Sequence, residues 1–413
     1  MTINNEHKKL NFSSEREQSQ ACLNSAEHEK NQGRKVLNVP NLRFPEFEGE
    51  WEKMRLDTFT ERVMRKNKNN LSKLPLTISA QYGLVDQITF FNKVVASTDL
   101  SNYYLLKKGE FAYNKSYSSD YPWGAIKRLD NYDQGALSSL YICFVPQDNV
   151  VSDFILQYFE SPKWHKGISE IAVEGARNHG LLNVAVQDFF HTYHYVPKDK
   201  KEQIKISKLL MLLDDRIATQ SKIIEDLKKL KCAIAERLFK VTNGDVVILS
   251  DVCNIQKGKQ VNGDCLSENG TYYVMNGGTE PSGYYEQCNT PANTISISEG
   301  GNSCGYVQYN RDAFWSGGHC YSLTDIQSNV CNLYLYHYLK SKESAIMKLR
   351  IGTGLPNIQK KDLEKFAVLL PPVAKQVRIS TFLTAIERKT TNEEILLSHF
   401  QEEKQYLLRQ MFI

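Results

Sequence analysis

The sequence has no hydrophobic run long enough to cross a membrane. Its longest apolar runs, such as Ala367–Leu370 and Leu209–Leu213, fall far short of the roughly 20 residues that a membrane helix needs. Residues 1–37 are mostly polar, lack the apolar core of a signal peptide, and are expected to form a disordered tail. The nine cysteines are scattered and form no Cys-x-x-Cys pair, which disfavours a zinc site or a disulfide framework. We therefore expect a cytoplasmic protein with reduced thiols, no membrane contact and no bound metal.

Sequence motifs of catalysis are also missing. There is no Gly-x-x-x-x-Gly-Lys-Ser/Thr loop for a nucleoside triphosphate, and no Asp/Asn-Pro-Pro-Tyr/Phe motif of the kind that amino-methyltransferases use on a flipped adenine. His191 and His194 lie in a strand-like aromatic run rather than on one helix face, so we expect packing rather than metal binding. The sequence predicts no catalytic residue and no cofactor on this chain.

The length of the chain limits the number of domains, and its net charge says little about its ligand. A chain of 413 residues with 41% hydrophobic content is long enough for two domains with separate cores. A formal net charge of +4 indicates nucleic acid only weakly, because a DNA-binding surface can be basic within a nearly neutral chain.

An internal repeat organises the sequence. Residues 202–239 align without a gap on residues 375–412, an offset of 173, and neither segment contains glycine or proline. Pro197 and Pro371–Pro372 lie just upstream, where helices are expected to start. At about 1.5 Å per residue, each helix would be roughly 57 Å long. The identical positions are Gln203, Ile206, Ser207, Leu210, Lys231 and Phe239 in the first copy, and Gln376, Ile379, Ser380, Leu383, Lys404 and Phe412 in the second.

Apolar residues recur in both segments mostly in steps of four and three, which is typical of the seam of a coiled coil. Shared polar positions, Gln220 with Glu393 and Lys231 with Lys404, indicate a specified register. The simplest pairing is antiparallel; two independent amphipathic helices remain the alternative. The seam residues, which are also the predicted spacer and partner-binding residues, are Ile206, Leu210, Leu213, Ile217, Ile224, Leu227 and Ile234, then Ile379, Leu383, Ile386, Leu397, Phe400 and Leu407.

The repeat continues upstream of each helix. Residues 180–197 (GLLNVAVQDFFHTYHYVP) resemble residues 354–371 (GLPNIQKKDLEKFAVLLP), and FILQYFES at 154–161 resembles YLYHYLKS at 334–341. Between these landmarks lie short alternating runs that predict strands joined by turns. We therefore expect an α+β fold with two mixed domains, at 38–197 and 242–371, separated by helices at 198–241 and 372–413.

This order of parts resembles the specificity subunits of type I restriction-modification enzymes. The resemblance covers nearly everything from Asn38 onward, and is carried by RFPEFEGEW at 43–51, GEFAYNKS at 109–116, the two Gly-x-x-Asn turns and the duplicated helices. It implies two target recognition domains that read the halves of a bipartite site in double-stranded DNA. It also implies that two modification subunits dock on the helices, that motor-nuclease restriction subunits join them, and that adenine methylation and cleavage occur on these partners.

Two loops offer the cations, donors and acceptors that DNA contact requires. Equivalent positions before the two Gly-x-x-Asn turns suggest a shared role such as phosphate anchoring; polar turns without function are the alternative for any one residue. The loop candidates are Tyr113, Asn114, Lys115, Ser116, Tyr117, Lys127 and Arg128 in the first domain, and Ser298, Glu299, Asn302, Ser303, Gly317, Gly318 and His319 in the second. The candidates beside the turns are Arg177 and Asn178, then Arg350 and Thr353.

Two other classes of function stay open at this point. A scaffold protein could use the coiled coil to dimerise and its two domains to bind other proteins, without DNA recognition. A self-sufficient restriction enzyme is disfavoured, because the duplicated frame already uses most of the 413 residues. Steep loss of affinity with salt would separate DNA recognition from a scaffold.

Overall fold

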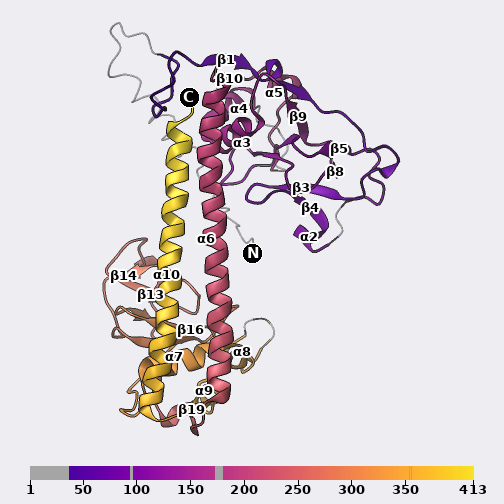
Figure 1. The fold of residues 1–413 in the computed structure, drawn as a ribbon. Coiled ribbons are helices and arrows are strands. Elements are labelled where there is room, and N and C mark those ends of the chain that lie inside the picture. Colours follow the sequence, from indigo (N-terminus) through magenta and orange to yellow (C-terminus); the bar gives the residue numbers. More distant parts are fainter. Residues whose placement is uncertain (1–36, 94–95, 173–179, 353, 355) are drawn as a thin grey trace, which may run out of the picture. The chain divides into compact units, whose positions relative to one another are not determined.

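The computed structural model describes residues 37–93, 96–172, 180–352, 354 and 356–413. The chain divides into two compact units (Figure 1). Unit 1 contains the residues up to Leu212 together with Lys404–Ile413, and unit 2 contains Leu213–Glu403. Each unit therefore holds one mixed domain and a part of each long helix. The predicted α+β class, with two mixed domains and two long paired helices, is confirmed.

Unit 1 is built on two four-stranded sheets, in the orders β2-β9-β6-β7 and β4-β3-β8-β5, and on the antiparallel pair β1-β10. Aromatic side chains fill its core, where Phe111 stacks on Phe144 and Tyr113 stacks on Phe189. The strands are β1 (Glu52–Arg55), β2 (Thr60–Arg62), β3 (Pro75–Ser79), β4 (Gly83–Asp86), β5 (Tyr104–Lys107), β6 (Phe111–Asn114), β7 (Ala125–Arg128), β8 (Gln134–Leu137), β9 (Ile142–Pro146) and β10 (Tyr193–Val196). The helices are α2 (Gln87–Phe91), α3 (Ser152–Glu160), α4 (His165–Ile171) and α5 (Val186–His191).

Unit 2 repeats the frame with fewer strands. Its sheets have the orders β12-β18-β15-β16 and β14-β13-β17, and the pair β11-β19 corresponds to β1-β10. The strands are β11 (Asp245–Ile248), β12 (Asn254–Lys257), β13 (Tyr272–Met275), β14 (Tyr284–Tyr285), β15 (Thr294–Ser298), β16 (Val307–Asn310), β17 (Trp315–Ser316), β18 (Cys320–Thr324) and β19 (Ala367–Leu370). The helices are α7 (Asn332–Ser341), α8 (Glu343–Met347) and α9 (Lys360–Glu364).

The long helices are α6 (Lys200–Val241) and α10 (Val373–Gln410). Each begins shortly after the proline that the sequence placed upstream, because proline cannot continue a hydrogen-bonded helix interior but is tolerated at its start. Within unit 2 the two helices run antiparallel (Figure 1). Gln220 contacts Glu393, and further along α6 Lys231 contacts Glu387, so the residue number rises on one helix as it falls on the other.

The predicted seam lies against the core or the partner helix. Its buried members are Ile206, Leu210, Ile224, Ile379 and Leu383; its half-buried members are Leu213, Ile217, Leu227, Ile234, Ile386, Leu397, Phe400 and Leu407. These side chains hold the fold together, so a partner protein would meet the opposite helix faces first.

Each domain attaches to the helices by the same contacts. In unit 1, Ile206 and Leu210 of α6 join the core together with Leu408, Met411 and Phe412. In unit 2, the repeat equivalents Ile379 and Leu383 join the core with Ala235 and Phe239. Burial of such aliphatic side chains contributes roughly 1.5–3 kcal/mol each.

The two repeated phenylalanines confirm this equivalence. Phe412 packs on Phe154 and Tyr158 of α3, with ring centroids 5.4 and 5.7 Å apart. Phe239 packs on Tyr334 and Tyr338 of α7 at 5.7 and 5.3 Å. The resemblance between FILQYFES and YLYHYLKS therefore reflects one structural task, which is to receive a helix-borne phenylalanine.

A repeated glutamine ties the start of each long helix to its domain. Gln203 accepts from Val151 N at the start of α3 and donates to Pro197 O, both at 2.8 Å. Gln376 accepts from Cys331 N at the start of α7 and donates to Pro371 O, also at 2.8 Å. Both side chains are buried, so each satisfies backbone groups that water cannot reach.

The RFPEFEGEW segment closes unit 1. Arg43 forms a two-pronged ion pair with the buried Glu202 of α6, and Trp51 Nε1 donates to the same carboxylate at 3.1 Å. Leu42 N donates to Gln410 O near the end of α10. Residues 41–51, which include this motif, thereby link the start of α6 to the end of α10. Across the described residues, no helix is both long and apolar enough to span a membrane.

Candidate nucleic-acid interface

Loops of unit 2 converge where several strands end. β12, β15 and the parallel pair β13-β17 finish at Lys257, Ser298, Met275 and Ser316, and β18 begins at Cys320. The register pairs Lys257 with Tyr321 and Ser298 with Cys320, so all these ends lie at one edge. We call the described residues at this edge, 257–260, 276–277, 298–303, 317–319, 350–352, 354 and 356–358, the unit 2 loop cluster.

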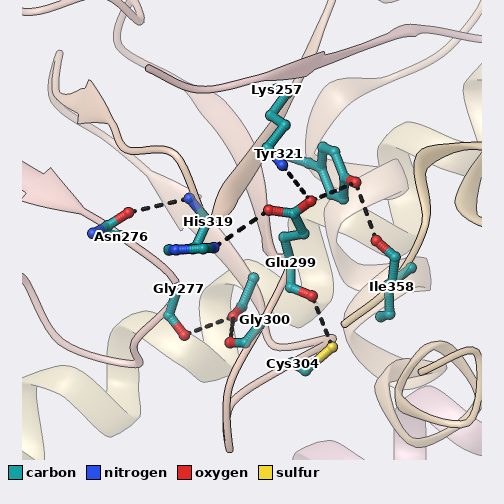
Figure 2. Close-up of polar contacts among 10 residues, drawn as sticks. Lys257, Asn276, Gly277, Glu299, Gly300, Cys304, His319, Tyr321 and Ile358 are labelled. Atoms are coloured by element: carbon teal, nitrogen blue, oxygen red, sulfur yellow. Dashed lines mark hydrogen bonds and ion pairs between the residues drawn. The ribbon is translucent and has the colours of Figure 1, made fainter. Parts of the chain in front are cut away.

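The carboxylate of Glu299 lies at the centre of this cluster (Figure 2). Its Oε1 accepts from Lys257 Nζ at 2.6 Å and lies 3.1 Å from the Tyr321 hydroxyl. Burial first, and the neighbouring Glu299 second, raise the pKa of Tyr321, so that hydroxyl keeps its proton. It therefore serves as a donor, either to Glu299 or to Ile358 O at 3.1 Å.

The backbone of Glu299 is fixed as firmly as its side chain. Its N donates to His319 O at 2.9 Å, and its O accepts from Ile358 N at 2.8 Å. Cys304 Sγ lies 2.9 Å from the same oxygen, and burial raises the pKa of that thiol. The backbone of Glu299 thus links His319, just before β18, to Ile358, just after the second Gly-x-x-Asn turn.

The side chain of His319 points towards solvent. Its backbone N donates to Asn276 Oδ1 at 3.1 Å, while 62% of its side chain is exposed. A Cβ on Gly317 would lie 2.6 Å from Asn276 Oδ1, and one on Gly318 would lie 2.6 Å from Gln260 Oε1. Gly317 therefore allows the close approach of the Asn276 side chain, whereas the end of the flexible Gln260 side chain could move away from a Cβ at position 318.

The remaining unit 2 candidates have mixed surroundings. Asn302 and Arg350 are exposed, and Ser303 is half-buried. Ser298 is buried and donates to Gly277 O at 2.6 Å, which corrects the prediction that its side chain faces DNA. All five residues of β15 are buried, because the strand lies between β18 and β16 and both of its faces are covered.

The corresponding loop of unit 1 follows β6. Tyr117 N donates to Gly180 O, and Leu182 N donates to Lys115 O at 2.9 Å. In unit 2, Gly301 N donates to Pro356 O and Ile358 N donates to Glu299 O, which is the same pattern two residues further along the turn. The loop after the central strand is thus joined to the Gly-x-x-Asn turn in both units, and Lys115 occupies the place of Glu299.

The exposed face of the unit 1 loop is small and polar. Asn114 Oδ1 accepts from Ser116 N at 3.0 Å, which fixes the turn; Ser116 is exposed and Tyr117 is 48% exposed. Lys115 is half-buried. These side chains are placed where a ligand could reach them.

Three unit 1 candidates are engaged inside the protein. Tyr113 is fully buried, and its hydroxyl donates to Trp123 O, so the prediction that it contacts DNA is corrected: both faces of β6 are covered. Lys127 pairs with Glu160 at 2.6 Å, and Arg128 pairs with Asp130 and Asp153 at 2.7 Å. Both cations have side chains only 11% exposed, which fits a structural role better than phosphate contact.

Arg177, Asn178 and Thr353 lie outside the described residues. Sequence reasoning missed Lys257 and Asn276, which position Glu299 and His319. The Lys-Gly-Lys run at 257–259 was the available signal for the first, since a cationic turn between strands is a common anion contact. No group of three or more His, Cys, Asp or Glu side chains in the described part of the chain is arranged to hold a metal ion.

Comparison with known proteins links these loops to a family. Residues 243–398 match the model of the type I restriction modification DNA specificity domain. A protein of Mycoplasma pneumoniae named as a type I specificity subunit is 34% identical over 131 residues, which are 32% of this chain and 34% of that protein. One of Mycoplasma genitalium is 31% identical over 121 residues, covering 29% of this chain and 31% of that protein. The chain thus matches about a third of the length of these relatives.

Solved structures share the fold over a longer span. The crystal structure of a type I restriction-modification system S subunit from M. genitalium superposes with a TM-score of 0.60 at 18% identity, covering 91% of this chain and 99% of that one. A chain from a study of complex assembly and conformational transition of the type I restriction-modification system superposes with a TM-score of 0.54 at 17% identity, covering 88% and 97%.

Proposed function

Taking this chain as a member of the type I restriction-modification specificity subunits, to which its matched domain belongs, we propose that it reads a bipartite, gapped DNA site. One domain reads each half. The chain itself carries no catalytic residue and no cofactor; adenine methylation and cleavage take place on partner subunits, which it directs to the site.

One observation supports this proposal most directly. The two domains attach to the long helices by the same contacts, but their loops expose different side chains. The Gln203 and Gln376 bonds and the Phe412 and Phe239 contacts repeat. The loop after the central strand, by contrast, exposes Ser116 and Tyr117 in unit 1 and Asn302 in unit 2. A common mounting with different loops is what two readers of different base sequences need, because base edges are distinguished by the donors and acceptors that meet them.

The outward faces of the long helices suit partner subunits. Ile223 of α6 is 40% exposed, and Leu396 of α10, its counterpart in the repeat, is 37% exposed. Ile204 and Val377 form a second exposed counterpart pair, at 51% and 46%. Repeated apolar positions on a surface support the docking of two copies of one modification subunit, with motor-nuclease restriction subunits joining that assembly.

Charge substitutions test this docking surface. Ile223→Asp and Leu396→Asp should each weaken co-purification with the modification subunit at least about tenfold, because an aspartate would be buried against an apolar partner. Ser221→Asp is the matched control, since Ser221 is exposed and lies about 200° around α6 from Ile223. Equal assembly of all three variants would contradict docking at this face.

The experiment that tests the function is methylome sequencing of a host that expresses this chain with its neighbouring modification subunit. Methyladenine in one gapped, two-part motif, absent without the chain, is the expected result. A complex that assembles but methylates no new motif and binds DNA without steep salt dependence would favour the scaffold alternative.

A further inference from the structure

Glu299 has one oxygen without a hydrogen bond among the described residues. Oε1 meets Lys257 and Tyr321, whereas Oε2 is buried and has no hydrogen-bond partner. The residue as a whole is 8% exposed. A buried carboxylate oxygen left without a donor is costly, so this atom calls for one.

The donor nearest to hand is His319. Its Nδ1 lies 3.6 Å from Oε2, just beyond hydrogen-bond distance (Figure 2). The backbone of His319 is held on both sides, by Asn276 and by Glu299 N, so only the ring has to turn for the contact to close. Closure would satisfy Oε2 and fix the ring orientation together.

Fixing Nδ1 as the donor also fixes the role of the other ring nitrogen. In a neutral imidazole one nitrogen carries the proton and the other accepts, and the bond made by the first decides the tautomer. With Nδ1–H directed at Glu299, Nε2 becomes an acceptor on a side chain that is mostly exposed. Gly317 and Gly318 beside it add no side chain that would hold a ligand away.

We propose that Glu299 is a positioning residue that holds His319 as a hydrogen-bond acceptor for an exocyclic amino group in the major groove. This inference rests on the proposed function and deepens it, since it names what unit 2 reads. Two bases present such a donor there, adenine through N6 and cytosine through N4. A phosphate is excluded as the target of Nε2, because a phosphate offers acceptors only.

The arrangement separates two tasks around one carboxylate. Lys257, with a side chain 53% exposed, holds Oε1 and contributes a positive charge, which suits attraction of any phosphate backbone. The backbone of His319 is held by hydrogen bonds, and its ring presents an acceptor when Nδ1–H is directed at Glu299, which suits a base edge. Glu299 is buried between them, so its own negative charge is kept from the DNA.

The test uses the assembled complex with its modification subunits and the motif found by methylome sequencing. Duplexes carry a single replacement in the second half-site, either adenine by purine, which lacks N6, or cytosine by 2-pyrimidinone, which lacks N4. Affinity is measured for the wild-type complex and for His319→Ala, Glu299→Gln and Lys257→Met. Comparing each replacement across the variants cancels its effect on the duplex itself.

One base replacement should lower the affinity of the wild-type complex about tenfold. The same replacement should not lower the affinity of the His319→Ala complex, which already lacks the contact. Glu299→Gln should lower the discrimination at that same base, whereas Lys257→Met should weaken binding to every duplex alike. Which replacement matters tells adenine from cytosine. Discrimination of the first half-site, which unit 1 reads, shows that each variant is folded and assembled.

Two results would overturn the inference. One is full wild-type discrimination in His319→Ala at every position; the other is a Glu299→Gln complex that binds all duplexes more weakly but discriminates normally, as a merely structural role predicts. Both leave the proposed function standing. A complex without any sequence preference would instead reject the proposed function.

Discussion

Gln220 and Glu393 are hydrogen-bonded to each other, and each is the counterpart of the other in the repeat, 173 residues apart. Gln220 Nε2 donates to Glu393 O at 3.1 Å and also contacts the Glu393 side chain. A residue meets its own counterpart only where the axis relating two helix segments passes, so this pair marks the centre of the α6–α10 pairing. A polar pair at that point fixes the register, because a shift by one heptad would separate the two groups.

Gln220→Glu should weaken the pairing by setting two carboxylates against each other. We expect a Tm lowered by about 2–4 °C at neutral pH. The exchanged double variant Gln220→Glu/Glu393→Gln keeps one amide and one carboxylate and should regain most of the loss. Differential scanning calorimetry of all variants measures this, and a double variant no better than the single one would refute the register role.

Lys231 should matter more for stability than other lysines of α6. It pairs with Glu387 at 2.8 Å, where that carboxylate also accepts from the Tyr336 hydroxyl, and both charged side chains are less than a third exposed. Lys231→Met leaves Glu387 without its cation and should cost about 1–3 kcal/mol, below the usual value for a fully buried pair.

The matched control is Lys229→Met, since Lys229 is mostly exposed and pairs with Glu225 on the helix surface. Urea unfolding should show a lower midpoint for Lys231→Met and an unchanged one for Lys229→Met. Equal midpoints for both variants would show that the contact with Glu387 adds nothing.

Acid should destabilise both units through buried histidines. Burial lowers the pKa of His194 to about 3 and that of His337 to about 4, from an ordinary value of 6.5. The unfolded chain therefore binds protons that the folded chain does not, so stability is fully present above pH 6.5 and falls as the pH drops towards 4. His194 lies between Tyr158 and Thr192, and His337 contacts Thr384, so neither ring is near solvent.

The measurement is urea unfolding between pH 7.5 and pH 4. A His194→Gln/His337→Gln variant should be less stable at pH 7.5, because the glutamines pack less well, but its stability should depend less on pH. A variant with the full wild-type pH dependence would mean that other groups account for the acid sensitivity. Glu387 is one such group, because burial raises its pKa but the contacts with Lys231 and its other partners lower the pKa by more.

Glu202→Gln should release the segment 41–51 from α6. The carboxylate has a side chain 2% exposed and holds both Arg43 and Trp51, and a neutral amide cannot accept from both in the same way. Hydrogen exchange at residues 404–413 and 37–51 should become roughly tenfold faster or more. Lys205→Met, which removes an exposed ion pair with Glu46, should leave exchange at 404–413 unchanged.

The sequence was informative where one periodic pattern decides the structure. The helices, their proline starts and the matched polar positions follow from spacing alone, and the repeat showed that Phe239 and Phe412 do the same task. The exposure of single loop residues did not follow. Tyr113 is buried because neighbouring helices cover the outer face of β6, and Arg128 is paired because Asp153, far along the sequence, lies beside it. Such facts depend on tertiary neighbours that no local pattern contains.

The buried glutamines Gln203 and Gln376 have a consequence for how such a chain can change. Each closes the same two hydrogen bonds, to a backbone amide at a helix start and to a proline carbonyl, and each is followed by the same isoleucine and leucine. A domain moved from one position to the other would find the same glutamine, isoleucine and leucine on the helix that it packs against. Because these attachment contacts are the same in both units, exchanging whole domains would change the loops that the chain exposes while the helices stay as they are.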